Sequence, residues 1–212
     1  MGAHRDPPLP GARAPEPRVD GAPRRARGQP PPSRHRPRPA RREGPLMASW
    51  VCPECGLDYD TISPPDGVVA VRSFPRRFRE KVEAAGDLLR ERPAPATWSA
   101  LEYTAHVADV TAWMADSIER MRTETNPTIS FPDPDALAAR ERYSEQDPAA
   151  VLARLKDACD RLAATIERFG PDDWKRTAGF QWGERDALTM MRNAVHEGAH
   201  HLRDIERGLA RG

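Results

Sequence analysis

Apolar residues recur every three or four positions in four separate stretches of the chain, which is the periodicity of a helix with one apolar face. These stretches predict helices over residues 73–92, 99–124, 147–169 and 185–209. Four such helices bury their apolar faces most simply against one another. The pattern therefore predicts an all-α fold, a four-helix bundle, with no strand pattern or repeat outside it.

The starts of two predicted helices carry clear local signals. Ser99 followed by Glu102 forms a capping box, which satisfies backbone donors in the first turn of the second helix. Asp147 and Pro148 place an N-cap residue before a proline at the first position of the third helix. These signals support the helix boundaries independently of the periodicity.

The lengths of the connections constrain how the helices are arranged. About five residues join the first two predicted helices, which suits antiparallel neighbours. The connection over residues 125–146 is much longer. A helix over residues 99–124 would be about 39 Å long, and this connection can span that length when extended. A bundle with a long connection between helices 2 and 3, in which those two helices run parallel, is therefore feasible.

The first 46 residues differ from the rest of the chain in composition. They hold 11 Arg, 4 acidic residues, 12 of the 23 Pro and no aromatic residue. Such a segment cannot bury enough apolar surface to offset its backbone entropy, so residues 1–46 are predicted to be a disordered basic tail. Their net charge is +7, against −6 for residues 47–212. We expect a solvated arm, or an extension upstream of a start at Met47, rather than a segment that binds nucleic acid or acidic lipid.

The chain lacks the usual signals for membranes and secretion. No stretch reaches the roughly 18–20 consecutive apolar residues of a membrane helix, and the N-terminus has no apolar core of a secretory signal. Three cysteines, an odd number, do not make a disulfide framework. These features predict a cytoplasmic protein with no membrane partner.

A short segment over residues 47–72, with a proline-rich turn, precedes the predicted bundle over residues 73–212. It contains Cys52-Pro-Glu-Cys55-Gly, which resembles one knuckle of a zinc ribbon. A full site needs a second pair of ligands. Cys159 lies on the apolar seam of the third helix, where a buried free cysteine is ordinary. Cys52 and Cys55 are therefore a weaker candidate for a second metal site.

Histidines on two predicted helices are the main candidates for metal ligands. The run His196-Glu197-Gly-Ala-His200 fits the pattern H-E-x-x-H, in which two histidines bind zinc and the glutamate activates water. At 100° per residue, however, His196 and His200 point away from the apolar seam of the last helix. Glu197 and His201 flank that seam one turn apart, and His106 flanks the seam of the second helix. The directions favour His106, Glu197 and His201 as ligands, with His196 and His200 as the alternative pair.

The favoured set has the number of ligands that a catalytic metal needs. Catalytic zinc sites use three protein ligands and keep a position for water or substrate, and bundle interiors host such sites. A single histidine beside an apolar seam is more often a hydrogen-bonded boundary residue than a ligand. On the residues alone, metal binding and a purely structural role both remain open.

Two blocks of the sequence resemble the DinB/YfiT-like superfamily, which includes mycothiol-dependent maleylpyruvate isomerases and other thiol-dependent S-transferases. They are W-S-x-x-E-x-x-A-H-V-A-D-V at residues 98–110 and V-H-E-G-A-H-H-L-R-D-I at residues 195–205. The resemblance implies a four-helix bundle that binds a divalent metal, zinc first and nickel as the alternative. It implies His106, Glu197 and His201 as ligands, and the order glutamate then histidine is similar to the isomerase-like branch.

The resemblance also implies a function, an S-transferase or isomerase that uses a low-molecular-weight thiol such as mycothiol. The metal would lower the pKa of the thiol and present the thiolate to a small-molecule substrate. Tyr103 and Trp113 could line the pocket. The alternatives are an H-E-x-x-H metallopeptidase built on His196 and His200, and a non-catalytic metal-binding or stress-response bundle. A shared fold does not identify the substrate, so the resemblance leaves open whether the protein is catalytic. A homodimer is compatible with the sequence.

Overall fold

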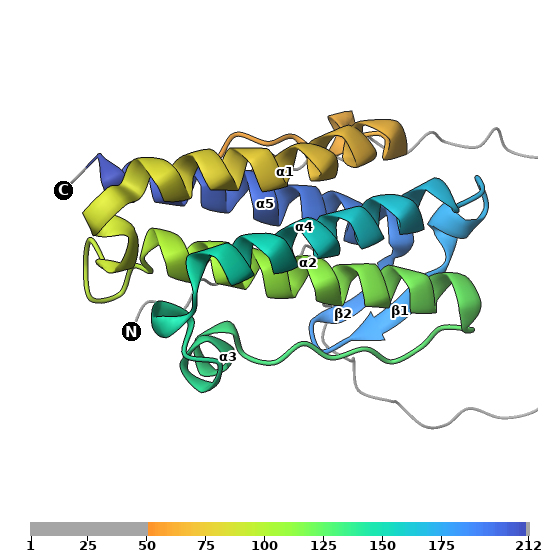
Figure 1. Ribbon diagram of the computed structural model, residues 1–212. Coiled ribbons are helices and arrows are strands. Elements are labelled where there is room, and N and C mark those ends of the chain that lie inside the picture. The colour runs from red at the N-terminus through yellow and green to blue at the C-terminus, as the bar shows by residue number, and fades with distance from the viewer. Residues whose placement is uncertain (1–50, 211–212) are drawn as a thin grey trace, which may run out of the picture. The chain divides into compact units, whose positions relative to one another are not determined.

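A computed structural model describes residues 51–210, and four long helices dominate it (Figure 1). They are α1 (Pro64–Ala85), α2 (Ala100–Thr123), α4 (Pro148–Glu167) and α5 (Ala187–Leu209). The shorter elements are helix α3 (Pro134–Arg140), strands β1 (Thr177–Phe180) and β2 (Gly183–Asp186), and the 3-10 helices η1 (Tyr59–Thr61), η2 (Gly86–Arg90), η3 (Tyr143–Glu145) and η4 (Asp173–Lys175). The predicted four-helix bundle is confirmed. The tail predicted over residues 1–46 lies outside the described residues.

The four long helices are arranged so that sequence neighbours are not always neighbours in space. Helices α4 and α5 each pack against both α1 and α2, whereas α1 and α2 touch each other little and lie on a diagonal. In Figure 1, α2 and α4 run in one direction and α1 and α5 in the opposite one. The chain between α2 and α4 returns along the length of the bundle (Figure 1). The long connection and the parallel pair that the sequence allowed are therefore both present.

The connection between α1 and α2 differs from the prediction. Helix α1 ends at Ala85, where Gly86 adopts a φ of +50°, a conformation that costs glycine little. The 3-10 helix η2 follows at once and keeps part of the apolar spacing, which is why the pattern extended to residue 92. Residues 86–99 then lead from one corner of the bundle to the diagonal one. The prediction that five residues join adjacent antiparallel helices is wrong.

Helix α1 begins at Pro64, not at the predicted residue 73. The Ser63 hydroxyl accepts a hydrogen bond from the backbone N–H of Asp66, and the Asp66 carboxylate accepts one from the N–H of Ser63 at 3.1 Å. Pro64 and Pro65 occupy the first helical positions, where a missing N–H removes no helical hydrogen bond. The proline-rich stretch that predicted a turn is therefore the capped start of a helix.

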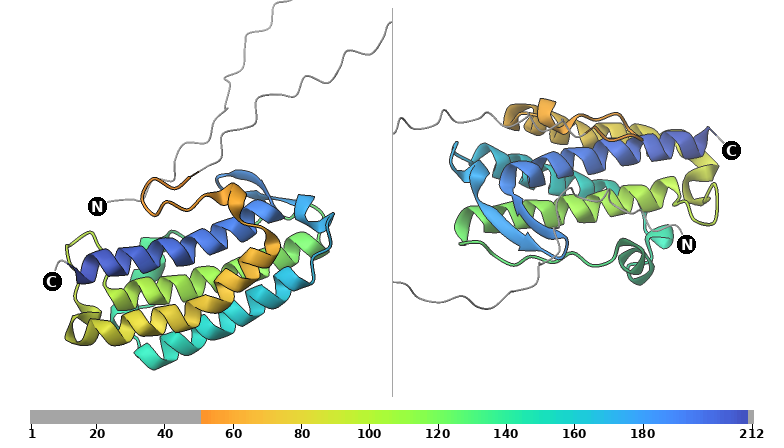
Figure 2. Two further views of the ribbon diagram at one scale, coloured as in Figure 1. Left: turned by 90° about the horizontal axis from the view of Figure 1, so that it is seen from above. Right: turned by 180° about the vertical axis from the view of Figure 1, so that it is seen from behind.

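A β-hairpin that the sequence pattern did not predict connects α4 to α5. Strands β1 and β2 pair antiparallel, and each has only four residues, too few to show a clear alternation. The hairpin also holds the long connection, because the Gly179 N–H donates to the Pro127 carbonyl and the Ile129 N–H donates to the Gly179 carbonyl, each at 2.9 Å. Figure 2 shows the hairpin at one end of the bundle, the end where α5 begins.

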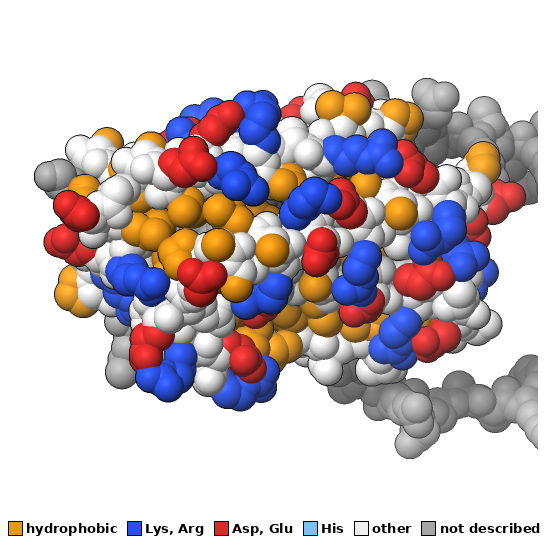
Figure 3. Space-filling view, viewed as in Figure 1, with side chains coloured by type: hydrophobic (Ala, Val, Ile, Leu, Met, Phe, Trp, Pro, Cys, Tyr) orange, Lys and Arg blue, Asp and Glu red, His pale blue; other side chains and the backbone are white. Residues whose placement is uncertain are grey.

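The face over α1 and α4 carries acidic and basic side chains side by side (Figure 3). Ion pairs link neighbouring helices, such as Arg72 with Glu167 and Arg168 with Glu119, each at 2.8 Å. Surfaces that bind nucleic acid gather basic side chains on one stripe, and this face does not show such a stripe. No helix within residues 51–210 is long and apolar enough to cross a membrane.

Candidate metal centre

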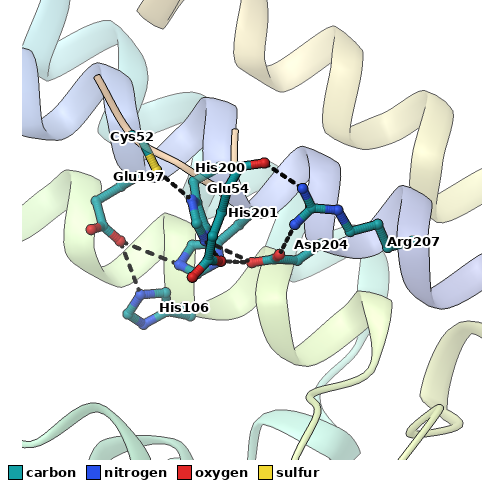
Figure 4. Close-up of polar contacts among 8 residues, drawn as sticks. All are labelled: Cys52, Glu54, His106, Glu197, His200, His201, Asp204 and Arg207. Carbon is teal, nitrogen blue, oxygen red and sulfur yellow. Dashed lines mark hydrogen bonds and ion pairs between the residues drawn. The ribbon is translucent and has the colours of Figure 1, made fainter. Parts of the chain in front are cut away.

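Helices α2 and α5 pack side by side, and their facing flanks bring three predicted side chains together (Figure 4). His106 comes from α2, and Glu197 and His201 come from successive turns of α5. Glu197 Oε2 lies 3.4 Å from His106 Nε2 and 3.3 Å from His201 Nε2. The three candidate ligand atoms all lie within 4.8 Å of one another. The fold therefore assembles the set that the helix directions favoured.

The spacing of these atoms fits tetrahedral coordination of a divalent cation. Ligand distances of about 2.0–2.2 Å place the nitrogen and oxygen ligands of a tetrahedral ion about 3.3–3.5 Å apart. The two separations from Glu197 Oε2 fall in this range. The side chains of His106 and His201 are 6% and 10% exposed, whereas that of Glu197 is 29% exposed. The two histidines are thus deeply buried, and the partly exposed Glu197 side chain forms the edge of the set nearest to solvent.

Helix α5 reaches this position through a close approach to α1. A Cβ on Gly198 would lie 2.3 Å from Cε2 of Phe74, well inside contact distance. Only glycine therefore allows the backbone of α5 to lie this close to the Phe74 ring. Because Gly198 is the residue after Glu197, this contact also sets where the candidate ligands of α5 lie.

Asp204 fixes the orientation of His201. Its Oδ2 accepts a hydrogen bond from His201 Nδ1 at 2.9 Å, which turns Nε2 of the same ring toward Glu197. A carboxylate on the far nitrogen is the usual support of a metal-binding histidine. Tyr103 stacks on the His201 ring with centroids 5.0 Å apart. Asp204 is a supporting residue that the sequence patterns did not single out, although its position three residues after His201 places both side chains on one face of α5.

The mutual contacts of these side chains set their protonation. Burial alone would raise the pKa of Glu197, but hydrogen bonds from His106 and His201 outweigh it and hold that pKa well below its ordinary value. Burial alone would lower the pKa of His201, but Asp204 and Glu197 outweigh it and raise the pKa to about 9. At His106 burial dominates and lowers the pKa. Binding of a metal at neutral pH would therefore displace a proton from His201.

The two ring nitrogens of His106 have different surroundings. Its ring lies 5.1 Å from that of Trp98 and 5.0 Å from that of His201. Its Nδ1 is buried, and no residue within 51–210 forms a hydrogen bond with it. Its Nε2 faces Glu197. Within these residues His106 therefore lacks the supporting carboxylate that Asp204 provides for His201.

His196 and His200 do not face this point. They lie on another flank of α5, together with Cys52 and Cys55. That flank points away from the bundle as predicted, yet His200 is only 8% exposed, because the segment that carries Cys52 lies over it (Figure 4). Glu197 therefore faces a different group of side chains from the two histidines of the H-E-x-x-H pattern.

The two predicted pocket residues lie in different surroundings. Tyr103 is buried against the site through its stacking contact. Trp113 packs instead on Phe131, with ring centroids 4.8 Å apart, and on Phe180 and Trp182 of the hairpin. Trp113 therefore belongs to an aromatic cluster beside the hairpin.

Fold and site together define a class of protein, a four-helix bundle in which two antiparallel helices bring two histidines and a glutamate to one point. The family model of the DinB superfamily matches residues 71–205. The chain belongs to the DinB superfamily, which confirms the resemblance seen in the sequence. None of the curated proteins matches the chain.

Two solved structures show the same fold. YfiT from Bacillus subtilis, described as a probable metal-dependent hydrolase with an unusual four-helix bundle topology, is 19% identical with a TM-score of 0.66, over 72% of this chain and 90% of YfiT. The mycothiol-dependent maleylpyruvate isomerase is 15% identical with a TM-score of 0.56, over 69% of this chain. The match spans 62% of the isomerase chain. At these identities the likeness shows the fold alone.

Proposed function

We propose that this protein is a metal-dependent enzyme that holds a divalent cation, zinc or nickel, through His106, Glu197 and His201 and activates a small nucleophile there. The observation that carries this proposal is a set of three candidate ligands that is open to solvent beside Glu197, whose side chain is 29% exposed. Metal sites with three protein ligands keep a position for an external molecule, whereas structural sites fill all four positions.

The burial and hydrogen bonds of the three candidate ligands set the charge and the direction with which they would bind a cation. A divalent cation held there would lower the pKa of a coordinated thiol or water. Burial keeps His106 neutral, and Asp204 turns Nε2 of His201 toward Glu197. The low pKa of Glu197 keeps its carboxylate ionised across the neutral range. One negative and two neutral ligands leave the cation with positive charge, which favours an anionic fourth partner.

Within residues 51–210, neither the cysteines nor Tyr103 offers a nucleophile beside Glu197, so we propose that the nucleophile is an external molecule. Cys159 is buried in α4, where burial raises the pKa of its thiol to about 12. Cys52 and Cys55 lie with His196 and His200, not with Glu197. Tyr103 is no substitute, since burial raises its pKa to about 12.

A small thiol of the mycothiol type suits this requirement, because a thiol ionises more readily than water. The mycothiol-dependent isomerase with the same fold uses such a thiol by its name. We therefore favour an S-transferase or isomerase that acts on a small electrophilic substrate. Hydrolysis is the second candidate, because the same site would activate water and YfiT is described as a probable hydrolase.

An assay with and without thiol tests the proposal. The zinc-loaded or nickel-loaded protein is mixed with mycothiol and a panel of electrophiles: cis-dicarboxylic acids, epoxides and haloaromatics. We expect turnover that needs both metal and thiol, and a loss of at least about 100-fold in His106→Ala, since a ligand should matter no less than its supporting residue. The matched control, His35→Ala, changes a histidine outside the described residues and should keep full activity.

The other outcomes are equally informative. Turnover of esters or amides that needs metal but no thiol would favour the hydrolase. Absence of turnover with every substrate, while the metal stays bound, would contradict an enzymatic role and leave a metal-binding bundle.

A further inference from the structure

The segment before α1 forms a tight turn that presents two thiols to α5. The Gly56 N–H donates to the Cys52 carbonyl at 2.8 Å, and the Cys52 N–H donates to the Leu57 carbonyl at 2.9 Å. Gly56 adopts a φ of +75°, which favours glycine, so the chain can reverse directly after Cys55. Cys52 is only 4% exposed, although it lies in a short segment at the edge of the bundle. The turn therefore buries a thiol against the helix.

The flank of α5 beneath this turn presents two imidazoles. His196 and His200 are one turn apart on α5 and lie on the flank that does not face α2. Cys52 Sγ lies 3.7 Å from His200 Nδ1. Candidate ligand atoms of Cys52, Cys55, His196 and His200 all lie within 4.8 Å of one another.

Both the residue types and the spacing match a structural zinc site. Zinc–sulfur bonds of about 2.3 Å and zinc–nitrogen bonds of about 2.0–2.1 Å place tetrahedral sulfur and nitrogen ligands about 3.6 Å apart. The separation between Cys52 Sγ and His200 Nδ1 is close to this value. Two cysteines and two histidines form one of the common closed ligand sets for structural zinc.

We propose that Cys52, Cys55, His196 and His200 form a second, structural zinc site that fastens the N-terminal segment to α5. The four residues differ from those of the proposed catalytic centre, and this proposal does not rest on the proposed function. The second pair of ligands that one zinc knuckle needs comes from a helix far along the chain, 148 residues after Cys52 in the case of His200. No second copy of the chain is required.

The two proposed sites share one supporting carboxylate. Asp204 Oδ2 lies 2.9 Å from His201 Nδ1 and 3.4 Å from His200 Nε2. Because His200 turns Nδ1 to Cys52, its Nε2 is the nitrogen that faces Asp204 (Figure 4). Arg207 joins the same group, since it donates to the backbone carbonyl of Glu54 and lies 3.5 Å from Asp204 Oδ1. Zinc at the second site would therefore hold in place the carboxylate that orients His201.

Substitution with cobalt(II) tests the second site through a signal that only thiolate ligands give. The full chain loaded with cobalt(II) is expected to show a thiolate-to-cobalt charge-transfer band in the near ultraviolet. The band should be lost in the double variant Cys52→Ser, Cys55→Ser and strongly reduced in His200→Ala. Cys159→Ser is the matched control and should keep it.

His106→Ala separates this proposal from the proposed function. That variant should keep the cobalt–thiolate band while it loses about one equivalent of bound metal. If His106→Ala bound as much metal as the unchanged chain but kept the band, the catalytic centre would be contradicted and the second site upheld. A cobalt-loaded wild-type protein without any thiolate band would overturn the second site, whatever the activity.

Alkylation of the wild-type chain gives a test that does not depend on the folding of a variant. In the zinc-loaded protein we expect Cys55, the less buried of the two thiols, to resist a thiol-alkylating reagent, and a chelator should make Cys55 reactive, as read by peptide mass spectrometry. Equal alkylation with and without zinc would overturn the proposal. A disulfide between Cys52 and Cys55 in the zinc-loaded protein would also overturn it.

Discussion

Two flanks of α5 carry residue pairs with the same spacing but different surroundings. Glu197 and His201 face α2, where His106 completes a set of three. His196 and His200 face the segment before α1, where two cysteines complete a set of four. The two pairs differ by a shift of one residue, which is a rotation of about 100° around the helix. The element packed on each flank, not the local motif, therefore decides which ligand set a histidine joins.

The two ligand sets also differ in how far their side chains are exposed to solvent. The set beside α2 contains no sulfur and is open at Glu197, whereas the other set covers its thiol from Cys52 and leaves no ligand position unused. Open sites with three ligands are typical of catalysis, and closed sites with four ligands are typical of structure. Under our proposals, α5 therefore contributes ligands to a catalytic metal site on one flank and to a structural zinc site on the other.

Asp204 lies between the flanks and contacts a histidine of each set, so its substitution should weaken metal binding strongly. Asp204→Asn removes the negative charge that holds His201 Nδ1–H, so we expect the affinity of the catalytic site for zinc to fall about 10–100-fold. Competition with a chromophoric chelator measures this affinity. The matched control Glu206→Gln removes a nearby carboxylate that pairs with Lys81 at 2.9 Å and should leave the affinity unchanged. Equal affinities for Asp204→Asn and the control would show that the carboxylate does not support the site.

Gly198→Ala tests the close approach that places both flanks. The added Cβ would meet the Phe74 ring, so we expect the free energy of unfolding to fall by about 1–3 kcal/mol. Urea denaturation followed by circular dichroism measures this change. Gly179→Ala is the control, because a Cβ there meets no atom within 4 Å. Recovery of stability in the double variant Gly198→Ala, Phe74→Leu would assign the loss to this contact, and an unchanged stability in Gly198→Ala would contradict it.

A pH titration of the metal-free protein should reveal a smaller effect at the start of α2, where Glu102 pairs with Arg92 of the preceding connection. Burial raises the pKa of Glu102, but bonds from Arg92 and from the Ser99 cap outweigh it, so the folded-state pKa lies below its ordinary value. The stabilisation is therefore complete above the unfolded-state pKa and is lost as the pH falls through the folded-state value. We expect Glu102→Gln to cost about 1–2 kcal/mol at neutral pH.

The pH dependence of the unfolding free energy provides the control for the Glu102→Gln variant. The difference in unfolding free energy between wild type and Glu102→Gln should shrink as the pH falls below about 4.5, the ordinary glutamate pKa. Asp172→Asn, at a carboxylate with 95% side-chain exposure, should show no such difference. A difference between wild type and Glu102→Gln that stays constant into acid would contradict the assigned role of the ion pair.

The sequence predicted the helices better than the short elements between them. Periodicity over many turns defined four helices, and the length of the chain after Thr123 allowed the parallel arrangement of α2 and α4. The start of α1 was missed because Pro64 and Pro65 suggest a turn until the Ser63 cap is considered. The hairpin was missed because strands of four residues do not show a period.

The two ligand sets were predictable to different degrees for a physical reason. His106, Glu197 and His201 each flank an apolar seam, so the direction of burial alone groups them. Cys52 and His200 belong to elements whose contact depends on how a short segment lies over the outer side of α5. No periodicity carries that information, and only the folded chain brings them together.

Counting the zinc ions bound by variants at two neighbouring histidines shows whether the two flanks of α5 bind separate ions. Native mass spectrometry is carried out on the zinc-loaded wild type, on His200→Ala and on His201→Ala. We expect two zinc ions in the wild type, one in each single variant and none in the double variant His200→Ala, His201→Ala, with Cys55 of His201→Ala still protected from alkylation. A wild type that binds a single ion, lost equally in both variants, would contradict this expectation.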